Sequence, residues 1–141
     1  MNKLLKKALE ISKDIHKKQK RNNGEDYINH PINVSKLVDT NDLKVIALLH
    51  DVIEDGNVTV NYLQKKGIPL ELIKVVVILS KKKDENYLDF ILRISNNKDA
   101  IIVKLADLED NLKDLKEGTK KDKYRLARHL LIYKLQELIG Y

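Results

Sequence analysis

Leu48-Leu49-His50-Asp51-Val52-Ile53-Glu54-Asp55 places one imidazole and three carboxylates within an apolar run that is expected to be helical from Leu43 to about Asp55. On a helix, the adjacent His50 and Asp51 point about 100° apart, so both can hold one cation only where they bend inward. Glu54 follows His50 by four residues and shares its face, which brings it close to any cation that His50 binds. The stretch predicts a metal site with Glu54 as its base.

A surface helix end is the alternative interpretation of the same residues, because Asp55 is followed by Gly56. The helix dipole disfavours carboxylates at the last turn, so Glu54 and Asp55 would need a positive partner there. The stretch alone leaves both interpretations open.

The composition indicates one globular, all-α domain over residues 1–141. The chain is 43% hydrophobic and 34% charged, with only two prolines and five glycines, and its apolar residues recur at helical spacing. It has no cysteine, which excludes disulfides, thiolate metal sites and a cysteine nucleophile. Any metal must therefore be bound by histidine and carboxylate side chains.

The formal charge of +6 is concentrated near the N-terminus. We attribute these lysines to solubility and consider nucleic acid an unlikely partner, because few aromatic residues and no groove-reading motif accompany them. Lys3, Lys6 and Lys7 interrupt the first apolar residues, and no later run is long enough to span a bilayer. We expect a cytoplasmic protein without a membrane partner.

Helical spacing accounts for most of the chain. The first twenty residues predict a helix, a turn follows at 21–26, and Pro31 suits the first turn of a second helix. His30 then lies at a helix start, where a ligand role and a capping role look alike. The β-branched run 75–78 also suits a strand, but no partner strand is evident. Residues expected on the apolar sides of the first and last helices are Leu4, Ala8, Ile11 and Ile15, and Tyr124, Leu126, Leu130, Leu131, Tyr133 and Leu138.

Asp107 is a further carboxylate in an apolar helical run, because it follows the largely apolar residues 100–106. Asn111 lies one turn further on and shares its face. A buried carboxylate is costly unless it is paired, hydrogen-bonded or bound to a metal. Four side chains are unexplained by packing: His30, His50, Asp51 and Asp107. Their nitrogen and oxygen atoms suit Mn, Fe, Zn, Co or Ni rather than Ca. Glu54 or Asp55 would then orient or deprotonate a water whose pKa the metal lowers.

Three segments resemble a known family: 21–31 (RNNGEDYINHP), 48–55 (LLHDVIED) and 103–111 (VKLADLEDN). In this order they are similar to motifs of the HD-domain metal phosphohydrolases, specifically the hydrolase domain of RelA/SpoT proteins and the small alarmone hydrolases. The resemblance implies a single-domain HD-type helical bundle with a metal site in the core cleft. It also implies one Mn²⁺, or another divalent transition metal, and removal of the 3′-pyrophosphate of guanosine tetra- or pentaphosphate.

The resemblance also implies roles for individual residues. The metal ligands would be His30, His50, Asp51 and Asp107, and Glu54 and Asp55 would be the catalytic acidic pair that handles the attacking water. Arg21 would bind substrate phosphate, and Asn111 would line the nucleotide pocket. Lys104 and Tyr87 are further substrate-binding candidates, although a buried lysine stem and a core tyrosine explain them equally well.

Three positions depart from the family pattern. Asn22 and Leu108 replace basic residues, and Asp110 replaces a histidine, so two cations are lost and an anion is gained near the pocket. The chain is also short after Asn111, which predicts an incomplete C-terminal wall. These changes predict weaker alarmone binding. The alternatives are hydrolysis of a different nucleotide or phosphate ester, or a nucleotide-binding regulatory module with a weakened site. The sequence does not predict the oligomeric state.

Overall fold

The computed structural model describes residues 2–140, and every regular element in that range is helical. The helices are α1 (Lys3–His16), α2 (Asn29–Lys36), α3 (Asn41–Leu49), α4 (Val52–Gly56), α5 (Val60–Lys65), α6 (Leu70–Ile78), α7 (Tyr87–Ile94), α8 (Lys98–Leu112) and α9 (Thr119–Ile139). An isolated β-bridge between Lys20 and Asp26 is the sole β feature of the described residues. The all-α prediction is confirmed, and 75–78 belongs to α6 rather than to a strand.

Local capping explains several helix starts. The side chains of Thr40, Thr59, Asn86 and Asn97 each accept a hydrogen bond from the backbone N–H three residues later, at the start of α3, α5, α7 and α8. Such caps satisfy N–H groups that have no partner inside the helix. They fix where α3 and α8 begin, and therefore where the functional groups at their far ends lie.

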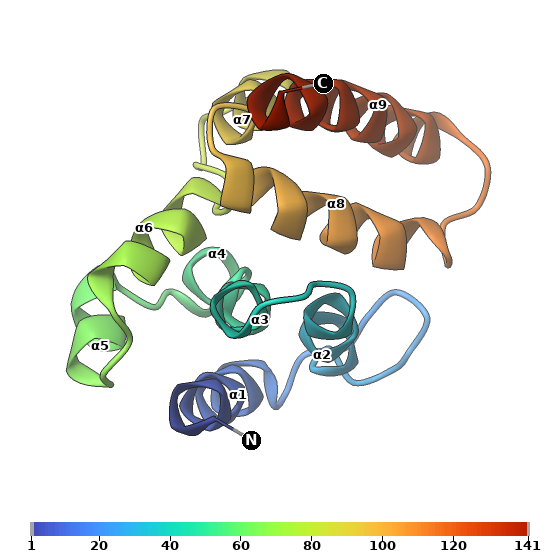
Figure 1. The fold of residues 1–141 in the computed structure, drawn as a ribbon. Coiled ribbons are helices and arrows are strands. Elements are labelled where there is room, and N and C mark those ends of the chain that lie inside the picture. The colour runs from blue at the N-terminus through green and yellow to red at the C-terminus, as the bar shows by residue number, and fades with distance from the viewer. Residues whose placement is uncertain (1, 141) are drawn as a thin grey trace.

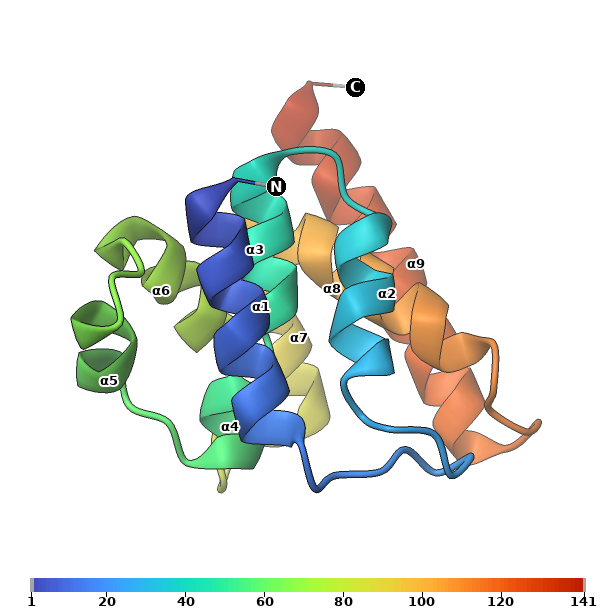
Figure 2. The same ribbon diagram turned by 90° about the horizontal axis from the view of Figure 1, so that it is seen from below.

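Helix α3 is the centre of the fold. It packs against α1, α2, α6 and α8, so that Figure 1 shows it end-on with these helices around it. In the perpendicular view, α1, α3 and α2 run side by side (Figure 2). Every residue of α3 from Val45 to Leu49 is buried. The burial of this apolar helix stabilises the bundle through the hydrophobic effect.

The third helix is shorter than the sequence predicts. It ends at Leu49, and Asp51, with φ −106° and ψ −2°, precedes the separate short helix α4. His50 and Asp51 therefore lie at the junction of α3 and α4 instead of inside one helix. Both interpretations of residues 48–55 are therefore partly correct. The polar residues follow the end of a helix, as a helix terminus requires, and His50 is buried, as a metal site requires.

The last helix also differs from its prediction. Its buried side chains are Ala127 and Leu131, whereas Leu126 is 72% exposed and Tyr133 and Leu138 are exposed as well. Apolar residues occur on more than one side of α9, so spacing alone did not identify the face that packs. Helix α9 lies against α8 and α7 (Figure 1). The predicted stripe of the first helix is correct, with Ala8 and Ile11 buried and Leu4 and Ile15 packed against the core.

Candidate metal centre and its flanking cavities

Four side chains from three parts of the fold meet beside the end of α3. His30 comes from the first turn of α2, His50 and Asp51 come from the α3–α4 junction, and Asp107 comes from α8. His30, His50 and Asp107 are all at least 96% buried. One donor atom from each of these three lies within 4.8 Å of the other two. The structure thus brings together the four residues that the sequence predicts as ligands.

The distances define one meeting point. His30 Nε2 lies 2.7 Å from Asp107 Oδ1 and 3.9 Å from Asp51 Oδ2. His50 Nε2 lies 3.0 Å from Asp51 Oδ2 and 3.3 Å from Asp107 Oδ1. Both Nε2 atoms therefore face the same two carboxylate oxygens.

The hydrogen bonds of the two Nδ1 atoms, which face away from the carboxylates of Asp51 and Asp107, determine what can bind between the Nε2 atoms. His50 Nδ1 lies 2.6 Å from the Ala47 carbonyl oxygen, and His30 Nδ1 lies 2.7 Å from Asp110 Oδ2. A carbonyl and a carboxylate only accept hydrogen bonds, so each neutral imidazole carries its proton on Nδ1 and directs an Nε2 lone pair inward. Lone pairs and carboxylates repel one another unless a cation or protons lie between them. The residues present therefore fit a divalent metal ion.

The ionisation of these groups follows from their mutual charges. Burial disfavours a charged His50, but Asp51 and Asp107 outweigh it and raise the pKa of His50 well above its usual value. Burial alone would raise the pKa of Asp51, but the charge of His50 outweighs burial and lowers this pKa to about 2. The charge of Lys104 contributes most to holding the pKa of Asp107 well below its usual range against burial. In the metal-free site, the negative charges of Asp51 and Asp107 therefore favour the protonated form of His50.

Metal binding is expected to release protons for this reason. The raised pKa favours a protonated His50 in the metal-free protein, and a cation that binds Nε2 must displace that proton. Mn²⁺ affinity should rise with pH below the pKa of His50 and level off above it. Isothermal titration calorimetry at pH 7 in two buffers of different ionisation enthalpy measures the protons released. A binding enthalpy that is the same in both buffers would contradict the expectation.

A second ring of polar groups holds the two carboxylates, Asp51 and Asp107, in place. The Tyr27 hydroxyl donates to Asp51 Oδ2 at 2.5 Å. Lys104 Nζ lies 2.7 Å from Asp107 Oδ2, and Asn111 Nδ2 lies 3.2 Å from Asp107 Oδ1. These contacts leave each carboxylate with one defined orientation.

Glu54 and Asp55 lie on α4, beside the centre but exposed. Glu54 Oε1 accepts the backbone N–H of Lys81 at 2.6 Å, which ties α4 to the loop after α6. Burial of the carboxyl raises the pKa of Glu54 above its usual value, and burial followed by the charges of Asp51 and Glu54 raises the pKa of Asp55 to about 6. The pKa of each carboxyl is therefore shifted towards neutral pH, which suits a proton acceptor.

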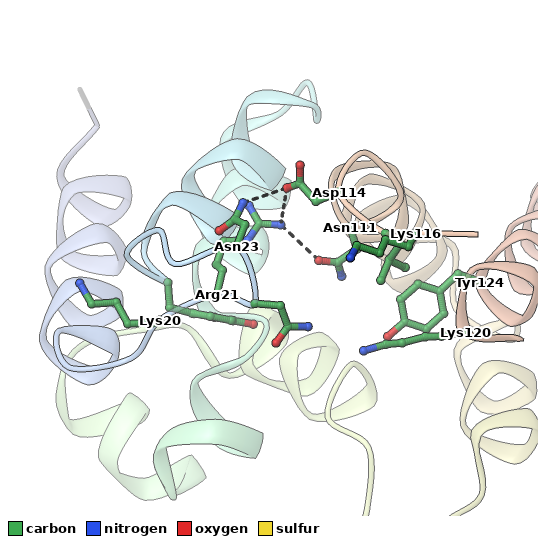
Figure 3. A pocket seen from close by; sticks show the side chains of 11 residues that line it. Lys20, Arg21, Asn23, Asn111, Asp114, Lys116, Lys120 and Tyr124 are labelled. Carbon is green, nitrogen blue, oxygen red and sulfur yellow. Dashed lines mark hydrogen bonds and ion pairs between the residues drawn. The ribbon is translucent and has the colours of Figure 1, made fainter. Parts of the chain in front are cut away.

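Two cavities open beside the centre. The larger, of about 640 Å³, contains Arg21, Asn22 and Asn111 together with Lys116 and Lys120 (Figure 3). The smaller, of about 340 Å³, reaches His50, Asp51 and Glu54 and is lined by four lysines, Lys81, Lys104, Lys120 and Lys123. Lys120 and Tyr124 of α9 border both cavities. The surroundings of the centre thus favour an elongated anion.

The predicted substrate-binding residues divide into two groups. Lys104 and Tyr87 border the smaller cavity, where the Tyr87 hydroxyl is buried without a hydrogen-bond partner among the described residues. Asn111 borders the larger cavity. Arg21 borders it too, but its guanidinium points towards Asn111 and Asp114 in Figure 3 and pairs with Asp110 at 3.0 Å. Its position therefore differs from that of a free phosphate-binding residue.

Two of the three positions that depart from the family pattern line neither cavity. Leu108 is fully buried in the core and borders neither cavity. Asp110 is buried as well, and its charge is matched by Arg21 and His30. Lys120 and Tyr124 of α9 line both cavities, and the absence of part of the C-terminal wall stays a prediction. Asn22 does face the larger cavity, as expected.

The sequence did not reveal several of these groups. Tyr27, Lys120 and Tyr124 contact or border the site, but nothing in their local patterns distinguishes them from packing or surface residues. The motif at 21–31 does contain Tyr27, which was the available signal for it.

Comparisons with known proteins identify relatives of this chain. No protein-family model matches the chain. It is 31% identical over 138 residues to a guanosine-3′,5′-bis(diphosphate) 3′-pyrophosphohydrolase of Aquifex aeolicus, an alignment that covers 90% of this chain and 20% of the relative. It is 33% identical over 144 residues to the bifunctional (p)ppGpp synthase/hydrolase SpoT of Escherichia coli, covering 92% and 20%. The chain thus spans about one fifth of the length of these relatives.

A solved structure shares the fold. It belongs to a metazoan ortholog of SpoT described as hydrolysing ppGpp, and the match has a TM-score of 0.78 at 22% identity over 96% of this chain and 87% of that one. The helical arrangement expected from the sequence is therefore confirmed. Within residues 2–140, no helix combines the length and apolarity needed to cross a membrane.

Proposed function

We propose, from the premise that this chain is homologous to the matched segment of the 3′-pyrophosphohydrolases, that it is a divalent-metal-dependent phosphohydrolase acting on guanosine tetraphosphate or a closely similar nucleotide. The observation that carries the proposal is the pair of inward Nε2 atoms facing Asp51 and Asp107. We also propose a cytoplasmic location, since the proposed substrate is a cytoplasmic nucleotide.

The ligands of the metal would be His30, His50, Asp51 and Asp107, and we propose Mn²⁺ as the ion. When bound, a divalent cation lowers the pKa of water and polarises a phosphoryl oxygen. The chain's own residues determine where this happens. His50 and Asp107 are buried, so they exclude bulk water from one side, while the smaller cavity admits substrate from the other.

Glu54 and Asp55 are the proposed proton acceptors. Glu54 borders the same cavity as His50 and Asp51, and the Lys81 amide fixes its Oε1. Its pKa, raised by burial of the carboxyl, makes it a stronger base than an ordinary surface carboxylate. Water would thus lose its proton to Glu54 or Asp55 while its oxygen attacks phosphorus.

The lysines of the two cavities are proposed to hold phosphate groups. Lys81, Lys104, Lys120 and Lys123 around the smaller cavity would hold the pyrophosphate that leaves. The larger cavity would take the nucleoside, with Asn111 at its inner edge and Tyr124 between the two spaces. Positive charge at this density favours a polyphosphate over a neutral ester.

Incubating the purified protein with Mn²⁺ and guanosine tetraphosphate tests the proposal. Hydrolysis consumes one water and yields guanosine diphosphate and pyrophosphate, both measurable by ion-exchange chromatography. Release of pyrophosphate or phosphate solely from other nucleotides in a panel would assign a different substrate. Binding without turnover of any member would instead favour the regulatory module.

The variant Glu54→Gln separates the base from the metal ligands. Glutamine keeps an oxygen that can accept the Lys81 amide but cannot take up a proton. We expect kcat to fall by about 10²- to 10⁴-fold with unchanged Mn²⁺ affinity. Glu117→Gln, an exposed carboxylate paired with Arg125, is the matched control and should retain full activity. Unchanged turnover in Glu54→Gln would show that Glu54 is not the base.

A further inference from the structure

A row of three charged or polar side chains lies directly behind the metal centre. Arg21 NH1 is 3.0 Å from Asp110 Oδ2, and the same oxygen is 2.7 Å from His30 Nδ1. Asn33 Nδ2 donates to the other oxygen, Asp110 Oδ1, at 3.2 Å. The side chains of Arg21, Asp110 and His30 are 9%, 3% and 2% exposed, respectively. The three side chains are therefore almost completely shielded from solvent, and Asp110 interacts with both of the others.

Asp110 determines how His30 presents its inner nitrogen. Because a carboxylate can only accept, it holds the His30 proton on Nδ1 and leaves the Nε2 lone pair for a cation. Carboxylates that accept the outer N–H of a metal-bound histidine fix the ring and make it a stronger ligand. Asn33 and Arg21 fix the carboxylate in turn, so its orientation is set from both sides.

Arg21 completes the row from the other end. Its NH1 faces Asp110, and its NH2 lies 3.4 Å from Asn111 Oδ1 and 3.9 Å from Asp114 Oδ2 (Figure 3). The guanidinium is thus engaged with the protein on two sides. A buried Asp110 without this counter-charge would be strongly destabilised.

We infer that Arg21 and Asp110 are positioning residues of the metal centre, which act through His30, and that Arg21 does not serve as a phosphate-binding residue. The inference rests on the metal centre of the proposed function, but it requires no particular substrate.

Mn²⁺ affinity measured without nucleotide tests the inference. In Asp110→Asn we expect an affinity about 10- to 100-fold weaker than in the unmodified protein, and in Arg21→Gln a smaller loss in the same direction. Asp114→Asn is the matched control: Asp114 also faces Arg21 but does not touch His30, so Mn²⁺ affinity should not change. The double variant should lose less than the sum of the single losses in free energy, because both residues act through one imidazole.

A spectroscopic measurement separates positioning from a general loss of structure. In Zn²⁺-loaded protein, long-range ¹H–¹⁵N correlation spectra report which nitrogen of His30 carries the proton. We expect Nδ1–H in the unmodified protein and an Nδ1–H signal shifted upfield in Asp110→Asn, because a neutral amide accepts that hydrogen bond more weakly, with the circular dichroism spectrum retained. If Asp110→Asn does not fold, the same two measurements on Arg21→Gln decide the question.

Two results would overturn the inference. One is an Mn²⁺ affinity in folded Asp110→Asn equal to that of the unmodified protein. The other is a raised KM in Arg21→Gln at unchanged Mn²⁺ affinity, which would make Arg21 a substrate-binding residue. An unmodified protein that binds no divalent cation would overturn the proposed metal centre itself, whereas failure to hydrolyse guanosine tetraphosphate would leave this test unaffected.

Discussion

Replacing Asp107 by asparagine is expected to weaken Mn²⁺ binding by about 100-fold or more, because outer partners alone are worth about 10- to 100-fold. Asp107 Oδ1 faces both imidazoles, and Oδ2 pairs with Lys104. The amide removes the negative charge that His30, His50 and Lys104 all face. Hydrolysis should fall at least in proportion when Mn²⁺ is limiting.

The design of this experiment must separate lost metal from lost structure. The Asp107→Asn change leaves the partly buried Lys104 without its closest counter-charge, and in fully buried pairs such a loss costs about 3–5 kcal/mol. Circular dichroism of the metal-free variant establishes whether the helices persist. Glu109→Gln, an exposed carboxylate two residues along α8, should leave both metal content and stability unchanged. A folded Asp107→Asn protein with normal metal content would remove Asp107 from the proposed ligands.

Leu131→Ala is expected to lower the free energy of unfolding by about 2–5 kcal/mol, the usual cost of a cavity left by a buried leucine. Leu131 is fully buried and shares the packed face of α9 with Ala127. Few other α9 side chains are buried, so a large part of the attachment of this helix depends on one residue. Urea denaturation followed by circular dichroism measures the effect.

The same variant should affect substrate more than metal. Lys120 and Tyr124 lie on α9, whereas His30, Asp51 and Asp107 lie on other elements. We expect KM to rise while Mn²⁺ affinity stays near normal. Leu126→Ala is the control, since Leu126 is 72% exposed and should change stability by less than about 0.5 kcal/mol. A loss below about 1 kcal/mol in Leu131→Ala would show that α9 is held mainly by other contacts.

The sequence predicted the meeting of His30, His50, Asp51 and Asp107 because polar groups in apolar runs must find partners. It did not predict the break between α3 and α4, since no glycine or proline marks it and the apolar pattern continues through Ile53.

The pairing of Arg21 with Asp110 shows a second limit. The two residues are 89 positions apart, and each alone suggests a charge available to a ligand. Only the tertiary structure shows that the two charges neutralise each other. A similar limit applies to α9, whose leucines lie on several faces, so that spacing cannot identify which face packs.

The separation of the four inward-facing groups along the chain has a consequence for biosynthesis. His30 and His50 precede Asp107 by 77 and 57 residues. A growing polypeptide on the ribosome thus displays both imidazoles well before the acid on α8 emerges from the exit tunnel. We therefore expect tight metal binding only after α8 has been synthesised. A chain released from the ribosome before that stage should not retain the metal ion.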